Sequence, residues 1–175
     1  KIQTLIISAA IAIALFSAGG CSKKKTIVSK GTPFQSQEEL AKFVCMKAND
    51  GDSDAIIEAY IPKKEYLEKV YPQTTEGKSK KHLSGEDYWR ILVERQRISD
   101  AKYQARQYKG RIKSVVGVGQ PKKIFQAGPF KILHRVPVHL EVEGSGGGIE
   151  HITDNDIMGV VIQDGNRFKL FNVFR

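Results

Sequence analysis

The stretch FKILHRVPVHLEVE, Phe130–Glu143, alternates apolar and polar residues more regularly than any other part of the chain. A period of two places successive side chains on opposite faces of an extended strand, so this stretch predicts a strand with one buried face. Pro137 cannot donate a backbone hydrogen bond, which predicts a sheet edge or a bulge at that point. The residues expected on the buried face are Phe130, Ile132, His134, Val136, Val138, Leu140 and Val142.

Further strands are expected on both sides of this stretch. Arg111 to Gly119 has strand character, Gly144 to Gly148 is typical of a flexible hairpin link, and Ile149 to Gln163 predicts the next strand region. The pair Asp164-Gly165 is a strong tight-turn signal. Arg167 to Arg175 has apolar residues on both faces, which indicates a central strand or one covered by a partner.

The part of the chain before these strands predicts helices. Ser36 and Glu39 have capping-box spacing, and Gly51 is expected to end the helix that they begin. Asp52 or Ser53 can start the next helix. Further helical segments are expected over residues 63–71 and 85–108, with a polar, mobile loop over residues 74–82. Helices followed by antiparallel strands indicate an α+β fold.

Two stretches carry a resemblance to known folds, "KANDGDSDAI" at residues 47–56 and "VVIQDGNRFKLFNVF" at residues 160–174. The pattern of elements from Phe34 to Arg175 is similar to the nuclear-transport-factor-2-like, cystatin-like superfamily. The resemblance implies one domain over residues 34–175, with N-terminal helices packed on a curved antiparallel sheet of about four strands. It does not imply an activity, because one fold hosts many functions.

The N-terminal segment has the layout of a secretory signal. Lys1 precedes an apolar run, Ile2 to Phe16, and small residues follow over positions 17–20. A membrane-spanning helix needs about 20 apolar residues, so this run is too short to be read as one. Residues 1–20 are therefore expected to be a signal peptide. The other interpretation is a buried core helix.

Cys21 follows the small residues directly. Ala18-Gly19-Gly20-Cys21 resembles a bacterial lipobox, although it lacks the Leu that commonly stands three residues before the cysteine. The resemblance implies acyl chains on Cys21, a basic tether over residues 21–33, and a lipid-anchored protein of the cell envelope. Ser22, in place of Asp, resembles lipoproteins sorted to the outer membrane. The alternative is ordinary signal cleavage that leaves a free cysteine.

Charge and cysteine content restrict the partners. Removing residues 1–20 leaves 155 of the 175 residues and lowers the formal charge from +9 to +8, because one Lys is lost. A basic protein can bind anionic lipid, acidic polysaccharide or nucleic acid. Because an exported protein rarely meets nucleic acid, that partner is not expected, and the sequence indicates no particular protein partner. Cys45 is expected to be a small buried residue on a helix, and the other interpretation is a nucleophile.

Motifs for cofactors and metals are incomplete. Asp50 to Asp54 has the opening spacing of a calcium loop, but Ala55 stands where Gly is needed and Ile61 where Glu is needed. The glycine-rich stretches lead into extended chain, whereas a phosphate site needs a helix N-terminus. The four histidines lack zinc-ligand spacing, and no serine elbow is present. No cofactor and no metal are expected.

Two site hypotheses remain. His134 is a polar residue on the apolar face of its predicted strand, where it could form a ligand site with Trp89, Tyr88 and Asp156. The alternatives are a core histidine bonded to the backbone and a histidine at an open end of the sheet. The second hypothesis is an anion-binding patch, because residues 101–135 contain nine Lys or Arg and no acid. Its members are Lys109, Arg111, Lys113, Lys122, Lys123, Lys131 and Arg135; the alternative is an ordinary solvated face.

Three classes of function are therefore open. The leading hypothesis is a membrane-anchored, non-catalytic envelope lipoprotein that binds a partner or has a structural role. The second is a binder of a small apolar ligand, held in the cavity of the cone that the curved sheet and its helices would form. The third is an enzyme that uses the face carrying His134.

Overall fold

A computed structural model describes residues 30–31, 33–79 and 83–172. The expected signal peptide, the lipidation residue Cys21 and most of the tether lie outside the described residues. The helical segments are α1 Gln37–Asp50, α2 Ser53–Glu58, α3 Lys63–Glu65, η1 Tyr66–Val70, η2 Tyr71–Gln73, α4 Thr75–Lys78, α5 Gly85–Tyr88, η3 Trp89–Val93 and α6 Glu94–Tyr108. The strands are β1 Ile112–Val118, β2 Lys123–Ala127, β3 Phe130–His134, β4 Val138–Glu143, β5 Ile149–Asp154, β6 Val160–Asp164 and β7 Arg167–Asn172.

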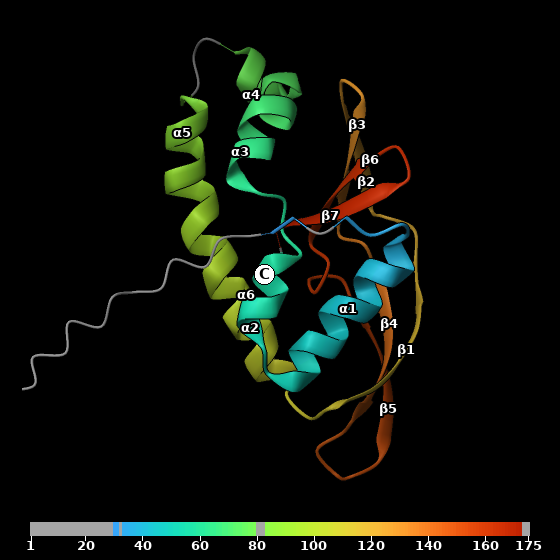
Figure 1. Cartoon of the computed structure of the whole chain (residues 1–175). Coiled ribbons are helices and arrows are strands. Elements are labelled where there is room, and N and C mark those ends of the chain that lie inside the picture. Colours follow the sequence, from blue (N-terminus) through green and yellow to red (C-terminus); the bar gives the residue numbers. More distant parts are fainter. Residues whose placement is uncertain (1–29, 32, 80–82, 173–175) are drawn as a thin grey trace, which may run out of the picture.

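The predicted α+β class is confirmed. Helices α2 to α6 lie on one side of the molecule, the strands lie on the other, and α1 crosses in front of them (Figure 1). All the strand pairs are antiparallel. The strands form two sheets, with the orders β1-β4-β5 and β2-β3-β6-β7, where a single sheet of about four strands was expected.

The first helix begins and ends, and the second begins, where the sequence predicts. The Ser36 hydroxyl accepts a hydrogen bond from the Glu39 amide at 3.0 Å, and Gly51 ends α1 with a φ of 76°. Glu39 also reaches back, but its carboxylate accepts from the Gln35 amide, one residue before the expected partner. Asp52 caps α2 through the Ala55 amide. The aspartates of the incomplete calcium motif therefore include a helix cap, as expected.

The predicted mobile loop over residues 74–82 is wrong for its first part. Residues 75–78 form the short helix α4, which Thr74 caps through the Gly77 amide. A Cβ atom at Gly77 would lie 1.9 Å from the Tyr71 carbonyl oxygen, so only glycine fits this close approach. Residues 80–82 of the predicted loop lie outside the described residues.

The prediction of one strand over Phe130–Glu143 is wrong. The chain leaves the four-stranded sheet after His134 and enters the three-stranded sheet at Val138. Arg135 has a φ of 50°, and its amide donates to the Gly159 carbonyl in the register of the β3–β6 pairing, just past the end of β3. The left-handed Arg135 and then Pro137, which has no N–H to donate, mark the turn that carries the chain from one sheet to the other.

The break divides the predicted apolar face between two cores. Val138, Leu140 and Val142 on β4 face the main core, as expected. On β3 the two faces are exchanged relative to the prediction. Leu133, expected on the polar face, lies in the main core, while Phe130 and Ile132 contact a second core on the opposite face of the sheet. His134 shares the second face, because residues two apart on a strand point the same way.

The remaining strands differ from the prediction in three respects. β2 was missed, and the strand region predicted over residues 149–163 is two strands, β5 and β6, in different sheets. β7 ends its sheet, so the prediction of a central position is wrong, but Phe34 and Tyr60 form bridges with Phe168 and Leu170. Apolar residues of β7 contact both cores, which explains the apolar character of its two faces.

Candidate functional site

The second core is an aromatic cluster between two helical segments and the four-stranded sheet. Tyr66 stacks on Phe171 with ring centres 4.6 Å apart and lies 5.5 Å from Trp89. The ring centres of Tyr71 and Tyr88 are also 5.5 Å apart. We call these five residues the aromatic cluster. It brings together two of the predicted site residues, Tyr88 and Trp89.

Both helical segments that border the cluster contain a π-helical turn, η1 and η3. A π turn holds more residues than an α turn, so residues four apart stay on one face instead of drifting around the helix. Trp89, Val93 and Arg97, four residues apart, are accordingly all buried. The π turn therefore orients Trp89 and Arg97 toward the same interior.

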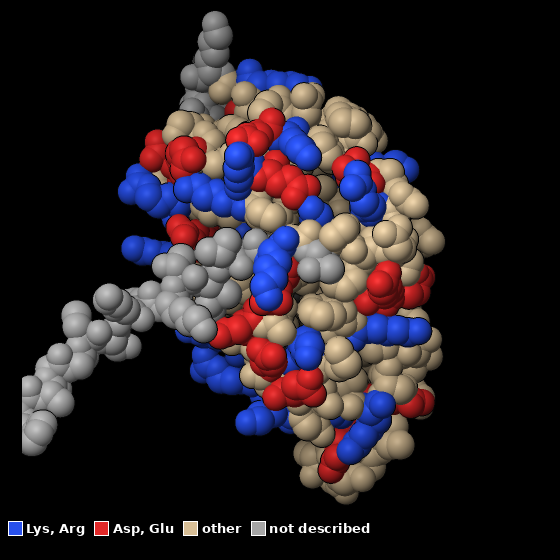
Figure 2. Space-filling view, viewed as in Figure 1, with Lys and Arg blue, Asp and Glu red and all other residues tan. Residues whose placement is uncertain are grey.

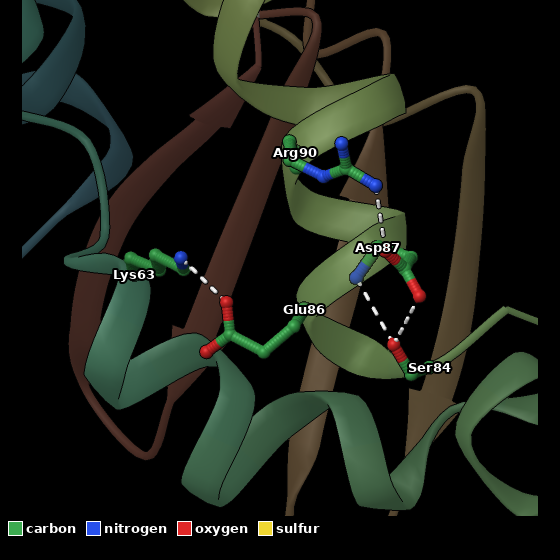
Figure 3. Close-up of polar contacts among 5 residues, drawn as sticks. All are labelled: Lys63, Ser84, Glu86, Asp87 and Arg90. Carbon is green, nitrogen blue, oxygen red and sulfur yellow. Dashed lines mark hydrogen bonds and ion pairs between the residues drawn. The ribbon is translucent and has the colours of Figure 1, made fainter.

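Polar contacts fix the start of the helix that carries Tyr88 and Trp89 (Figure 3). The Ser84 hydroxyl accepts from the Asp87 amide at 3.1 Å and donates to the Asp87 carboxylate at 2.8 Å. Arg90 donates to the other carboxylate oxygen at 2.8 Å, and this bond, followed by that from Ser84, lowers the Asp87 pKa. Glu86 pairs with Lys63 at 2.6 Å and so ties α5 to α3.

Arg97 is a buried cation that sequence reasoning missed. Its guanidinium lies 4.3 Å from the centre of the Tyr60 ring and 4.7 Å from that of Trp89, and it donates to the Ile61 carbonyl at 2.9 Å. Burial lowers the Arg97 pKa to about 10, so the side chain remains charged at neutral pH. In the sequence, Arg97 is one of several basic residues on a helix, and nothing distinguishes it from the exposed ones.

Other polar groups are buried along the same side of α6. Asp100, Gln104 and Asn172 of β7 are each 2–6% exposed. The Gln104 and Asn172 carbonyl oxygens and the Arg97 Nε have no hydrogen-bond partner among the described residues. Buried polar atoms of this kind commonly bind ordered water.

His134 lies at the end of β3, half-buried, on the sheet face that also carries Phe125. The two rings meet edge to face with centres 4.9 Å apart, and Lys123 is the residue opposite His134 on β2. Burial first, and then the charge of Lys123, lower the His134 pKa. The imidazole is therefore expected to be neutral at pH 7.

Asp156 lies in the link between β5 and β6. Partial burial and then the neighbouring Asp154 raise the Asp156 pKa, against the opposing charges of Arg135 and Lys122. The Lys122 amide donates to the His134 carbonyl and the Arg135 amide donates to the Gly159 carbonyl, so the β5–β6 link that holds Asp156 runs beside the end of β3 that carries His134. Tyr88 and Trp89 share the aromatic cluster, while His134 and Asp156 lie at this end of the four-stranded sheet.

A small pocket adjoins the second core, because Ile61, Phe130 and Ile162 belong to both. Its volume is about 40 Å³, and Glu65 and Lys169, which pair at 2.6 Å, are among the charged residues that line it. The lining residues are Ile61, Glu65, Lys69, Phe130, Ile162, Asp164, Arg167 and Lys169. Sites for drug-sized ligands measure about 300–1,000 Å³, so this pocket has room only for water or a very small group.

The predicted anion-binding residues form two groups. Lys109, Arg111 and Lys113 lie where α6 leads into β1, and Lys113 pairs with Glu143 at 2.5 Å. The other group is exposed on and beside β2 and β3, and its members are Lys122, Lys123, Lys131 and Arg135. On the face shown in Figure 2, acidic side chains alternate with basic ones.

Cys45 is fully buried in the main core, as expected for a small apolar residue. Burial first, and then the charge of Asp154, raise the Cys45 pKa to about 12. Because the thiolate is the reactive form, this thiol is not available as a nucleophile at neutral pH. Within the described ranges, no three His, Cys, Asp or Glu side chains are arranged to hold a metal ion.

Comparisons with known proteins add no relative: no protein-family profile, curated protein or solved structure matches the chain. Of the helices that the structure describes, none combines the length and the apolar character needed to cross a membrane.

Proposed function

We propose that the protein is a bacterial envelope lipoprotein, held on the outer membrane by acyl chains on Cys21, with a non-catalytic domain that binds a partner or has a structural role. One observation carries the proposal. A cation, a short apolar run, small residues and Cys21 follow one another in the order that lipoprotein processing requires. Several acyl chains anchor a protein stably, because each buried methylene adds about 0.8 kcal/mol of membrane affinity.

The contacts of the first described residues support a tethered domain. Lys30 pairs with Glu58 at 2.8 Å, and Gly31 donates to the Glu58 carbonyl. Phe34 exchanges backbone hydrogen bonds with Phe168. About nine residues separate Cys21 from Lys30, and a chain of that length spans at most about 30 Å. The acyl chains would therefore hold the domain close to the membrane.

The surroundings of the candidate site support a non-catalytic role. An acid–base site needs groups that converge on one substrate atom, whereas the small pocket described above is lined by neither His134 nor Asp156. The buried thiol of Cys45 supports the same conclusion.

The test is the chemistry of the mature N-terminus. The chain is expressed with its signal in a bacterial host that processes lipoproteins, and the membrane-bound product is analysed by mass spectrometry. We expect an acylated Cys21 as the first residue. Cys21→Ala should abolish acylation and leave the unprocessed precursor.

Cys45→Ala is the matched control, because Cys45 is the only other cysteine. This variant should be acylated and membrane-bound like the parent protein. An unmodified Cys21, or a mature chain that begins at another residue, would contradict the proposal.

A further inference from the structure

The outward side of the helix formed by η3 and α6 combines apolar and basic side chains. Ile91, Leu92 and Ile98 are 52%, 49% and 39% exposed, and Tyr103 is 38% exposed. These are large apolar groups in water, on the side of the helix opposite to the buried Val93, Arg97 and Ala101. Isolated exposed apolar residues are ordinary, but several on one helix face can mark a binding surface.

Cations occupy the positions between these apolar residues. Residues three or four apart lie on one helix face. Ile91, Arg95, Ile98, Lys102 and Arg106 follow this spacing and are all exposed. We call these five residues, with Leu92 and Tyr103 beside them, the outer α6 face.

The charge of the outer α6 face is strongly one-sided. Glu94 is the only exposed acid within Trp89–Arg106, since Asp100 is buried. No ion pair within the described ranges involves Arg95, Lys102 or Arg106. Basic side chains also project from the edge of the molecule along which α6 runs (Figures 1 and 2).

We propose that the outer α6 face lies on an anionic phospholipid surface. Apolar side chains can enter the boundary between headgroups and acyl chains, while the long stems of Lys and Arg let the charges remain among the phosphates. Each Lys or Arg near an anionic membrane contributes about fivefold in affinity. The charge complementarity favours this occupant over a second copy of the chain, whose outer α6 face would be equally basic.

The inference rests on the proposed function for its choice of membrane, the one that Cys21 would anchor. The start of the described chain agrees with it. Lys30 and Gly31 are bound to Glu58 at the end of α2, and α2 packs directly against α6. A chain anchored about nine residues earlier would therefore keep α6 within reach of the lipid.

The test measures contact between α6 and lipid in the full processed protein. Ile98→Trp places a fluorophore on the outer α6 face, and Ile149→Trp places one on exposed β5, while the native Trp89 is buried in both variants. Each protein is reconstituted in brominated phosphatidylcholine vesicles, with or without phosphatidylglycerol. We expect quenching of the added fluorophore only for Ile98→Trp with phosphatidylglycerol, and its loss in high salt.

Two charge reversals of equal size locate the contact. In the Ile98→Trp protein, Arg95→Glu, Lys102→Glu and Arg106→Glu together should reduce the population in contact at least about tenfold. Lys122→Glu, Lys123→Glu and Lys131→Glu together change the net charge equally, at exposed positions on and beside β2 and β3, and should preserve the quenching. Circular dichroism and urea unfolding identify any variant that misfolds.

Several results would overturn the inference. They are equal quenching at positions 98 and 149, loss of quenching in both reversal variants, and quenching that needs no anionic lipid. Shielding of the Ile98→Trp fluorophore without lipid, rising with protein concentration, would instead indicate an interface between copies. Retention of the protein in neutral vesicles tests the acyl anchor separately. The proposed anchor and the proposed lipid contact of the outer α6 face can therefore be disproved independently.

Discussion

At the scale of single residues, Arg97 is a buried charge with contacts to three other residues. Its charge is removed from water but lies against two aromatic faces, and it hydrogen-bonds the Ile61 carbonyl at the start of the segment that leads to η1. A desolvated cation–π contact contributes about 2 kcal/mol, and a buried hydrogen bond to a charged group about 1.5–3 kcal/mol. Arg97 therefore connects α6 both to the end of α2 and to the aromatic cluster.

We expect Arg97→Met to lower the free energy of unfolding by about 2–4 kcal/mol, because it removes both contacts and leaves a carbonyl without its donor. Urea unfolding followed by circular dichroism measures the loss. Arg95→Met, an exposed position on the same helix, is the control and should change the stability by less than about 0.5 kcal/mol. Similar losses for the two variants would show that Arg97 has no special role.

At the scale of elements, α4 shows how a backbone contact can override helix propensity. Alanine normally stabilises a helix relative to glycine by about 1 kcal/mol. At Gly77, however, an added methyl group would meet the carbonyl oxygen of Tyr71, a backbone atom that cannot rotate away. The approach of α4 to η2 therefore depends on the absence of a side chain at residue 77.

We expect Gly77→Ala to destabilise the protein by about 1–3 kcal/mol, the usual cost of forcing an extra carbon into a packed site. Gly146→Ala is the matched control, because a Cβ there meets no atom within 4 Å and the backbone is not left-handed. Its effect on the urea midpoint should be close to zero. A Gly77→Ala variant that is more stable than the parent would contradict the packing argument.

At the scale of the whole molecule, the two cores bury several weak acids in their protonated forms. Burial is the first cause of the raised pKa values of Cys45, Tyr66, Tyr88 and Tyr108. Tyr108 also donates a hydrogen bond to Asp154, whose other carboxylate oxygen accepts from the Asp156 and Ile157 amides. Ionising these groups would therefore disturb both cores and the contact between α6 and the strands.

We expect the stability to fall as the pH rises above about 8.5, where the unfolded Cys45 thiol begins to ionise, and more steeply near pH 10, where unfolded tyrosines ionise. The pKa values of these groups are higher in the folded protein, so in this pH range the unfolded chain binds fewer protons. The free energy of unfolding therefore decreases as the pH rises. Arg97, with a pKa lowered to about 10, acts in the opposite direction only above that pH.

Urea midpoints measured from pH 7 to pH 10 test this dependence. Cys45→Ala should delay the fall until the tyrosines begin to ionise. A stability that stays constant up to pH 10 would contradict the burial of these groups.

Some features of this protein follow from the sequence by itself, because they depend on neighbouring residues. Ser36, Gly51 and Asp52 bound the first helices through short-range hydrogen bonds, and Asp164-Gly165 specifies the turn between β6 and β7. The α+β order of elements and the expected lipid anchor are local patterns of the same kind, the anchor remaining a prediction. The burial of Cys45 also agrees with its place among apolar helical residues.

Other features were decided only by the tertiary structure, because they depend on which surfaces meet. Alternation shows that a segment is extended, but not which sheet it joins, so the division of residues 130–143 at Arg135 could not be predicted. β2 lies at a sheet edge with few buried residues and therefore lacks a clear pattern. The burial of Arg97 follows from long-range packing, which brings Tyr60 and Trp89 against its guanidinium.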